Sequence, residues 1–135
     1  MAAFSTSSAA PAPLARQEGH EPPLVVVALC AAWCNTCAEF RPVFDAIAAA
    51  RPAMTFVWLD IEDDAEICGD LDVESFPTVL AFRGRRALHF GVTLPIAAVA
   101  ARLIDELARR DQPSAGIPDA AIALCNALAA ARSER

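Results

Sequence analysis

The chain has 135 residues, a formal net charge of −6 and an apolar content of 56%. These values fit one domain with a hydrophobic core, because single domains commonly contain about 100 to 150 residues. The chain contains no lysine, and its acidic balance excludes the cationic surface that nucleic-acid binding requires.

Residues 1–23 are rich in alanine, serine and proline and lack the basic start and apolar run of a secretory signal. We interpret them as a flexible N-terminal arm. No run of about 18 apolar residues occurs in the sequence, which therefore predicts no membrane-spanning helix. Five cysteines with only one close pair are not typical of a small secreted disulfide scaffold, so we expect a cytoplasmic protein.

From residue 24 onward, the spacing of apolar residues alternates between that of strands and that of helices. The valine-rich run 24–30 predicts a buried strand. Apolar residues at helical spacing then predict a helix over about 35–50, which Arg51 and Pro52 end. Residues 54–61 predict a second strand, and the acidic stretch after it predicts a short helix.

Two more strands are predicted in the second half of the chain, over 77–83 and 86–92, with a turn at Gly84. An amphipathic helix follows, marked by a stripe of apolar residues. We expect Thr93 to cap this helix and Pro95 to lie in its first turn.

This order of elements predicts an α/β fold: a three-layer sandwich with a mixed four-stranded sheet between helices. We assign residues 24–111 to this domain and residues 112–135 to a linker and an extra C-terminal helix. The last helix has one apolar stripe, formed by Ala121, Leu124, Cys125 and Leu128. We expect the stripe to pack on the core. The alternative is a dimer surface, so the protein is expected to be a monomer or a dimer through this helix.

A close pair of cysteines, Cys34 and Cys37, lies between the first strand and the first helix. Backbone N–H groups in a first helical turn lack partners, and the helix dipole favours negative charge there. A thiolate at Cys34 is therefore stabilised, and the thiolate is the form that attacks disulfides. Cys37, one helical turn further on, can then attack the mixed disulfide and release the reduced partner. Trp33 is expected to shield the pair and to offer an apolar surface to that partner.

The residues around this pair resemble the thioredoxin family. The family motif of tryptophan, cysteine, two residues and cysteine is present as residues 33–37, and the proline of its first helix is matched by Pro42. The family's proline and threonine at the head of a strand are matched by Pro77 and Thr78. Its turn glycine is matched by Gly84, and its glycine after the fourth strand by Gly91. The resemblance covers roughly residues 24–110.

The resemblance implies a thioredoxin-like fold and a thiol-disulfide oxidoreductase in which Cys34 is the nucleophile and Cys37 the resolving thiol. It also implies that Pro77 is cis and lies beside the sulfurs, so that a substrate chain binds at Trp33, Phe76 and Pro77. The implied partners are protein disulfides and a thiol that donates electrons, as in electron transport and cell redox homeostasis. No cofactor and no metal is implied.

Three departures from the family pattern are evident. A buried aspartate and its lysine partner are replaced by Ala28 and Trp58. This removes a proton relay and predicts slower exchange unless water or Glu62 substitutes. Asn35 and Thr36 stand between the cysteines in place of Gly and Pro, which predicts a somewhat more oxidising potential. The first strand and helix of full thioredoxins have no counterpart in residues 1–23.

The other cysteines have simpler interpretations. We expect Cys30 to be a small apolar filler of the strand, with a redox role as the less favoured alternative. We expect Cys125 to be buried; if it is exposed, an intermolecular disulfide is the alternative. Cys68 is expected to be unreactive because its neighbours are acidic. His20 and His89 have no partner at metal-ligand spacing. The acidic stretch from 60 to 74 is interpreted as a solvated face, with docking of a basic partner as the alternative.

Two other functions compete with disulfide exchange at this stage. A non-catalytic interaction or chaperone module that keeps the fold is one, favoured by the missing relay residues. A metal-binding protein is less favoured, because zinc takes about four ligands and only one close pair is present.

Overall fold

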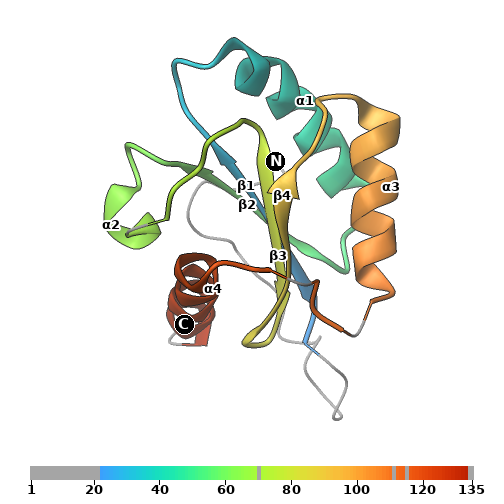
Figure 1. Cartoon of the computed structure of the whole chain (residues 1–135). Helices are drawn as coiled ribbons and strands as arrows, with labels where there is room; N and C mark the ends of the chain where they lie inside the picture. The colour runs from blue at the N-terminus through green and yellow to red at the C-terminus, as the bar shows by residue number, and fades with distance from the viewer. Residues whose placement is uncertain (1–21, 70, 111, 115, 134–135) are drawn as a thin grey trace.

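The computed structural model describes residues 22–69, 71–110, 112–114 and 116–133 of the chain. The predicted arm therefore lies outside the described residues except for Pro22 and Pro23. Figure 1 shows a central sheet with α1 and α3 on one side and α2 and α4 on the other. This arrangement confirms the predicted three-layer α/β sandwich.

The sheet has four strands in the order β2-β1-β3-β4. These strands are β1 (Leu24–Cys30), β2 (Thr55–Asp60), β3 (Thr78–Arg83) and β4 (Arg86–Val92). β1 pairs with β2 in parallel and with β3 antiparallel, and β3 pairs with β4 antiparallel. The sheet is therefore mixed, as the sequence predicts, and β1 lies inside it with all seven residues buried.

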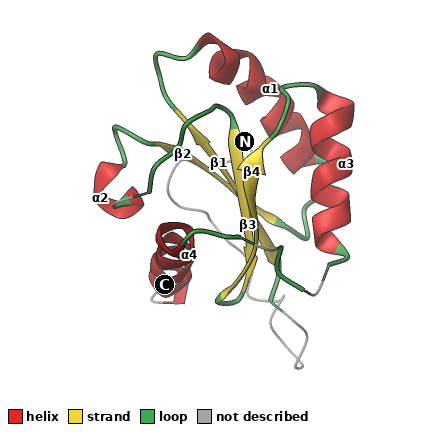
Figure 2. Cartoon of the chain, viewed as in Figure 1, coloured by secondary structure: helices red, strands yellow, loops and turns green. Residues whose placement is uncertain are grey.

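Among the described residues, four helices are formed, and Figure 2 shows them on both sides of the sheet. They are α1 (Asn35–Ala49), α2 (Ala65–Cys68), α3 (Ala97–Ala108) and α4 (Asp119–Ser133). α1 and α3 are held together near the end of α1 by Arg51, whose guanidinium donates to both carboxylate oxygens of Asp105 at 2.8 and 2.9 Å. This hydrogen-bonded ion pair lowers the pKa of the Asp105 carboxyl.

The two faces of the sheet carry separate hydrophobic clusters, because successive strand residues point to opposite faces. On the first face, Leu24, Val26 and Ala28 of β1 pack with buried residues of α1 and α3. On the second face, Val25 and Val27 belong to the cluster that contains residues of α2 and α4. Neither face of the sheet is left without a helical cover in the described part of the chain.

The apolar stripe of the last helix is core. Ala121, Leu124, Cys125 and Leu128 are all buried in the second cluster. The prediction that this stripe packs on the core is confirmed, and so is the burial of Cys125. The helix thus completes the layer that lies opposite α1 and α3 (Figure 1).

The start of α3 differs from the prediction. The helix begins at Ala97 with Ile96 as its N-cap residue, so Pro95 lies before the helix and not in its first turn. Thr93 is not the cap, because its hydroxyl donates to the carbonyl of Leu94 and its backbone N–H donates to the carbonyl of Pro77 at 3.0 Å. These bonds hold Thr93 in the connection between β4 and α3.

None of the helices among the described residues is long and apolar enough to cross a membrane.

Candidate active site

The cysteine motif occupies the short connection between β1 and α1. Its backbone N–H at Cys34 donates to the carbonyl of Ala31 at 3.0 Å, which closes a tight turn at the end of the strand. Cys34 is the N-cap residue of α1, with an extended backbone, and its carbonyl accepts from the N–H of Ala38 at 3.2 Å. The fold thus puts Cys34 where the first helical N–H groups and the positive end of the helix dipole lie.

Cys34 is a free and partly exposed thiol. The helix that follows it has 15 residues, with no acidic residue in its first turn and no side chain capping its N-terminus. The first turn of α1 thus places no negative charge beside Cys34. The assignment of Cys34 as nucleophile nevertheless stays a prediction, as does the assignment of Cys37 as the resolving thiol.

Cys37 forms a disulfide with Cys30, the last residue of β1. The Cα atoms of the two residues are 5.8 Å apart, within the usual range for disulfides. Both side chains are buried, with exposed fractions of 1% for Cys30 and 2% for Cys37. The prediction that Cys30 is only a packing residue is wrong, because its sulfur is bonded to the cysteine that the sequence paired with Cys34.

Cys30 was missed because a continuous apolar run does not tell which residues face which helix. Strand alternation places Cys30 on the same face as Val26 and Ala28, the face that α1 covers. Two facts together would have identified Cys30 as a partner of Cys37. Alternate residues of a strand share one face, and the first helix covers the face that includes Cys30.

Trp33 and Phe76 come together from two loops that meet at one end of the sheet. Their rings pack edge to face with centroids 5.6 Å apart, although 43 residues separate them in sequence numbering, and the indole of Trp33 is 63% exposed. The indole N–H donates to Glu62 at 3.1 Å. The peptide bond between Phe76 and Pro77 is cis, as the resemblance implied. Phe76, the residue before the cis proline, therefore contacts the cysteine loop through Trp33.

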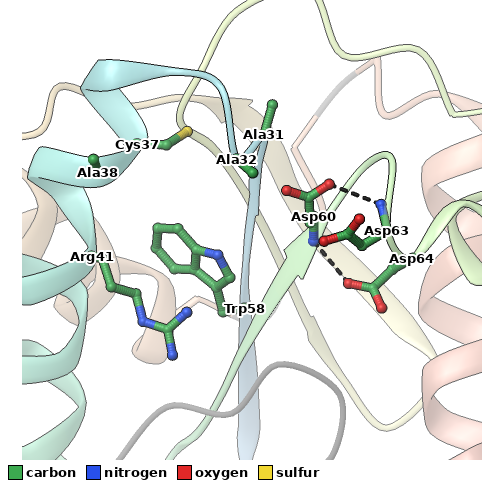
Figure 3. Close-up of a pocket in the computed structure, with 9 residues that line it drawn as sticks. All are labelled: Ala31, Ala32, Cys37, Ala38, Arg41, Trp58, Asp60, Asp63 and Asp64. Carbon is green, nitrogen blue, oxygen red and sulfur yellow. Dashed lines mark hydrogen bonds between the residues drawn. The ribbon is translucent and has the colours of Figure 1, made fainter.

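A pocket of about 390 Å³ opens beside Cys37. Figure 3 shows the Cys37 side chain pointing from α1 towards the end of β1, with Trp58 and Arg41 below it and three aspartates across the opening. Two of these carboxylates are used by the backbone. Asp60 accepts from the N–H groups of Glu62 and Asp63 at 2.8 and 2.9 Å, and Asp64 accepts from the N–H of Asp60 at 2.9 Å.

The position of the missing relay aspartate is fully enclosed. Ala28 has an exposed fraction of 0% and lies in the cluster with Phe40 and Phe44. Its parallel partner in β2 is Trp58, the residue matched to the family lysine. The Trp58 ring packs on both phenylalanines and carries the guanidinium of Arg41 over its face at 4.6 Å. Aromatic packing thus fills the space where the family has a buried ion pair.

The two remaining cysteines are poor nucleophiles. Cys68 is buried, and desolvation, followed by the charges of Asp64 and Asp60, raises the pKa of its thiol to about 11. Burial likewise raises the pKa of Cys125 to about 12. The expectation of low reactivity at Cys68 is supported, with burial as a larger cause than the acidic neighbours that the sequence pointed to.

The histidines and acidic residues do not gather into a metal site in the described ranges, where no group of three or more His, Cys, Asp or Glu side chains could hold an ion. Burial lowers the pKa of His89, with a smaller contribution from the positive charge of Arg110. His20 lies outside the described residues. In the acidic stretch, Glu62, Asp63 and Glu66 are exposed, in agreement with a solvated face.

Comparison with known proteins gives the class to which this fold and site belong. The Thioredoxin family model matches residues 16–101, which is more than half of the chain. This chain therefore belongs to the thioredoxin family, and the resemblance inferred from its motifs is confirmed.

Two relatives illustrate the degree of similarity. An Arabidopsis thaliana protein named thioredoxin H10 is 37% identical over 65 residues, which are 48% of this chain and 42% of that protein. The thioredoxin of Mycoplasmoides gallisepticum is 36% identical over 59 residues, which are 44% of this chain and 59% of that protein. The chain thus spans less than two thirds of the length of these two relatives.

Solved structures agree on the fold. The crystal structure of thioredoxin NaTrxh from Nicotiana alata superposes with a TM-score of 0.57 at 23% sequence identity, covering 64% of this chain and 75% of that one. At this level of identity the match shows the thioredoxin fold and no more.

Proposed function

We propose that this protein is a thiol-disulfide oxidoreductase that exchanges electrons with protein disulfides, with Cys34 as nucleophile and Cys37 as resolving thiol. The observation that carries the proposal is the free, partly exposed thiol of Cys34 at the N-cap of α1, one helical turn before Cys37. Membership of the thioredoxin family supports the same chemistry.

The reaction runs from the form in which Cys34 and Cys37 are both thiols. The Cys34 thiolate attacks one sulfur of a substrate disulfide, and the other substrate sulfur leaves as a thiolate that takes a proton from solvent. The Cys37 sulfur, deprotonated, then attacks the Cys34 sulfur and releases the second substrate thiol. Two electrons have passed to the substrate, and a disulfide joins Cys34 to Cys37 until an external thiol donor reduces it.

Substrate binding is assigned to Trp33, Phe76 and Pro77. The exposed indole of Trp33 and the ring of Phe76 in edge-to-face contact give an apolar surface next to Cys34. The backbone of Phe76 can pair with an extended substrate chain. This surface recognises the main chain and apolar side chains around a disulfide, which suits unfolded or exposed protein segments.

The proposal extends to the compartment and the oligomeric state of the protein. We assign it to the reducing cytoplasm, where it takes part in electron transport from a thiol donor, because five cysteines with one close pair are not typical of a secreted disulfide scaffold. We expect it to act as a monomer, because the stripe of α4 that offered a dimer surface is buried against its own sheet.

The proposal is tested by the reduction of insulin disulfides in the presence of dithiothreitol. We expect catalysis well above the rate with dithiothreitol alone. A rate equal to that background contradicts the proposal. It then favours a non-catalytic interaction module, for which the loss of the buried aspartate at Ala28 is the specific observation. That alternative predicts that a variant with both Cys34→Ala and Cys37→Ala still binds the partner proteins of the wild type.

The missing proton relay gives a prediction of its own. In an Ala28→Asp variant, a carboxylate replaces a methyl group in the enclosed site on the α1 face of β1. Because a positioned acid or base contributes about 10²- to 10⁴-fold to proton transfer, we expect insulin reduction to accelerate on the order of 10²-fold at pH 7. The pH profile of the rate should also acquire a new titration.

The matched control is Ala28→Asn, which has nearly the same shape but cannot titrate. Both variants bury a polar group and lose stability, so thermal unfolding of both must show folded protein at the assay temperature. If Ala28→Asp and Ala28→Asn give the same rate and the same pH profile, Ala28 is not the cause of slow exchange.

A further inference from the structure

The site contains a third cysteine that the proposed reaction does not use. Cys37 lies between two possible partners: Cys34 precedes it by one helical turn, and Cys30 is bonded to it from the end of β1. A sulfur holds one disulfide at a time. The presence of the bond from Cys30 to Cys37 together with a free Cys34 therefore defines a second oxidised form of the same site.

We infer that Cys30 is a third redox-active residue, which takes the disulfide over from Cys34 and stores it in the protein interior. The inference rests on the proposed function, since Cys34 must first become oxidised by substrate. It assigns to the site a step after substrate release, in which the disulfide moves from the surface to the core.

The step is an internal exchange that balances without an external oxidant or reductant. The Cys30 sulfur, deprotonated, attacks the Cys37 sulfur of the disulfide between Cys34 and Cys37. The bond from Cys34 to Cys37 breaks, the bond from Cys30 to Cys37 forms, and Cys34 leaves as a thiolate. The proton lost by Cys30 passes to solvent. One disulfide is present before and after, so no electron is gained or lost.

Burial gives the direction of this exchange. Cys30 and Cys37 have exposed fractions of 1% and 2%, so in the isomer joined through Cys34 the Cys30 sulfur is confined to the protein interior as a neutral thiol. Cys34 is partly exposed, so water can solvate the charge on its sulfur as it leaves. The isomer with the buried disulfide and the partly exposed Cys34 sulfur is therefore the favoured one.

Burial also gives the order of events. An oxidised substrate reaches Cys34 first, because Cys34 is partly exposed whereas Cys30 and Cys37 are almost fully buried. The disulfide must enter through Cys34 and then move inward. Cys34 lies close to Cys30 along the chain, because the turn of residues 31–34, closed by the hydrogen bond from the Cys34 N–H to the Ala31 carbonyl, directly follows Cys30.

This isomer has a chemical consequence for the protein's partners. Its Cys34 thiolate can attack a second disulfide, but Cys37 is bonded to Cys30 and cannot resolve the product. The oxidised protein therefore holds a protein partner as a long-lived mixed disulfide, whereas the reduced protein releases it. A donor thiol that reduces the bond between Cys30 and Cys37 restores the resolving thiol.

The test is a disulfide map of the oxidised protein. Reduced protein is freed of reductant, oxidised with one equivalent of diamide, and unfolded in guanidinium chloride at acid pH with N-ethylmaleimide present, so that buried thiols are also blocked. It is then digested with chymotrypsin. Cleavage after Trp33 and Phe40 puts Cys30 in one peptide and both Cys34 and Cys37 in another, covering residues 34–40. Mass spectrometry with fragmentation then reads which sulfurs are joined.

We expect most of the protein to yield the two peptides joined through Cys30 and Cys37, with one maleimide on Cys34. A Cys30→Ala variant should instead yield peptide 34–40 with an internal disulfide and no maleimide. The matched control Cys125→Ala, at a buried cysteine in the other cluster, should give the wild-type map.

The inference is overturned if most of the wild-type protein shows a maleimide on Cys30 and a disulfide within 34–40, or a bond from Cys30 to Cys34. Diamide oxidation requires no enzymatic turnover, so the map is independent of insulin reduction. A protein that fails to reduce insulin but gives the expected map loses the proposed function and keeps the three-cysteine site. The reverse result keeps the function and removes Cys30 from it.

Discussion

A Cys34→Ser variant is expected to lose at least about 10³-fold in kcat/KM for insulin reduction, because a serine hydroxyl is not ionised near neutral pH and cannot replace an attacking thiolate. In the structure, Cys34 is a free and partly exposed thiol, while the other two free cysteines are buried. The two buried thiols have pKa values raised to about 11 and about 12, so neither can take over at pH 7.

The control for this prediction is Cys125→Ala, which removes a thiol from the opposite cluster and leaves the cysteine loop untouched. We expect this variant to reduce insulin at the wild-type rate. Activity that survives in Cys34→Ser and disappears in Cys125→Ala would reverse the assignment of the nucleophile.

The second large effect concerns stability. Leu124 of α4 has an exposed fraction of 1% and packs in the cluster on the second face of the sheet. Leu124→Ala removes buried methyl groups and leaves a cavity, so we expect the free energy of unfolding to fall by about 3 kcal/mol. Urea unfolding followed by tryptophan fluorescence measures the change, which should appear in the midpoint and not in the slope.

The same helix offers a matched control. Ile122 is similar in size to Leu124 but 37% exposed. Its replacement by alanine should cost under about 1 kcal/mol, because Ile122 is partly in water already and is not a member of the buried cluster that contains Leu124. Equal losses at the two positions, or no loss at Leu124, would show that α4 is not part of the core.

The sequence predicted the course of the chain well because its apolar residues follow the periods of the elements they form. The run 24–30 and the helical spacing around Phe40 identified β1 and α1 almost to the residue. The predicted strand 54–61 exceeds β2 by one residue at each end, and the predicted strand 77–83 exceeds β3 by one at its start. Boundaries of this kind depend on the last ladder bonds and not on composition.

The prediction that Thr93 caps α3 was wrong for a different reason. Thr93 is a residue type that favours helix N-caps, but its hydroxyl and backbone N–H already bond to Leu94 and Pro77. Pro77 comes from a loop 16 residues earlier in the chain, and that tertiary contact is not encoded in local propensity. The helix therefore begins later, at Ala97, with no side chain capping it.

The site was predicted in part. Local sequence placed Cys34 and Cys37 at the start of α1, and the family motif pointed to Phe76, whose ring contacts Trp33, the residue before Cys34. The bond from Cys30 to Cys37 was not predicted, because β1 is buried on both faces and shows no alternation that separates them. Cys30 faces the motif because α1 packs on that face of β1, and the sequence of the strand does not show which face the helix covers.

The nucleophilic role of Cys34 is tested most directly by trapping its intermediate. A Cys37→Ser variant cannot resolve a mixed disulfide, so incubation with insulin should give a covalent adduct that dithiothreitol releases, joined through Cys34 in a peptide map. A variant with Cys34→Ser added should form none. An adduct through any other cysteine, or no adduct while the wild type reduces insulin, would contradict the account.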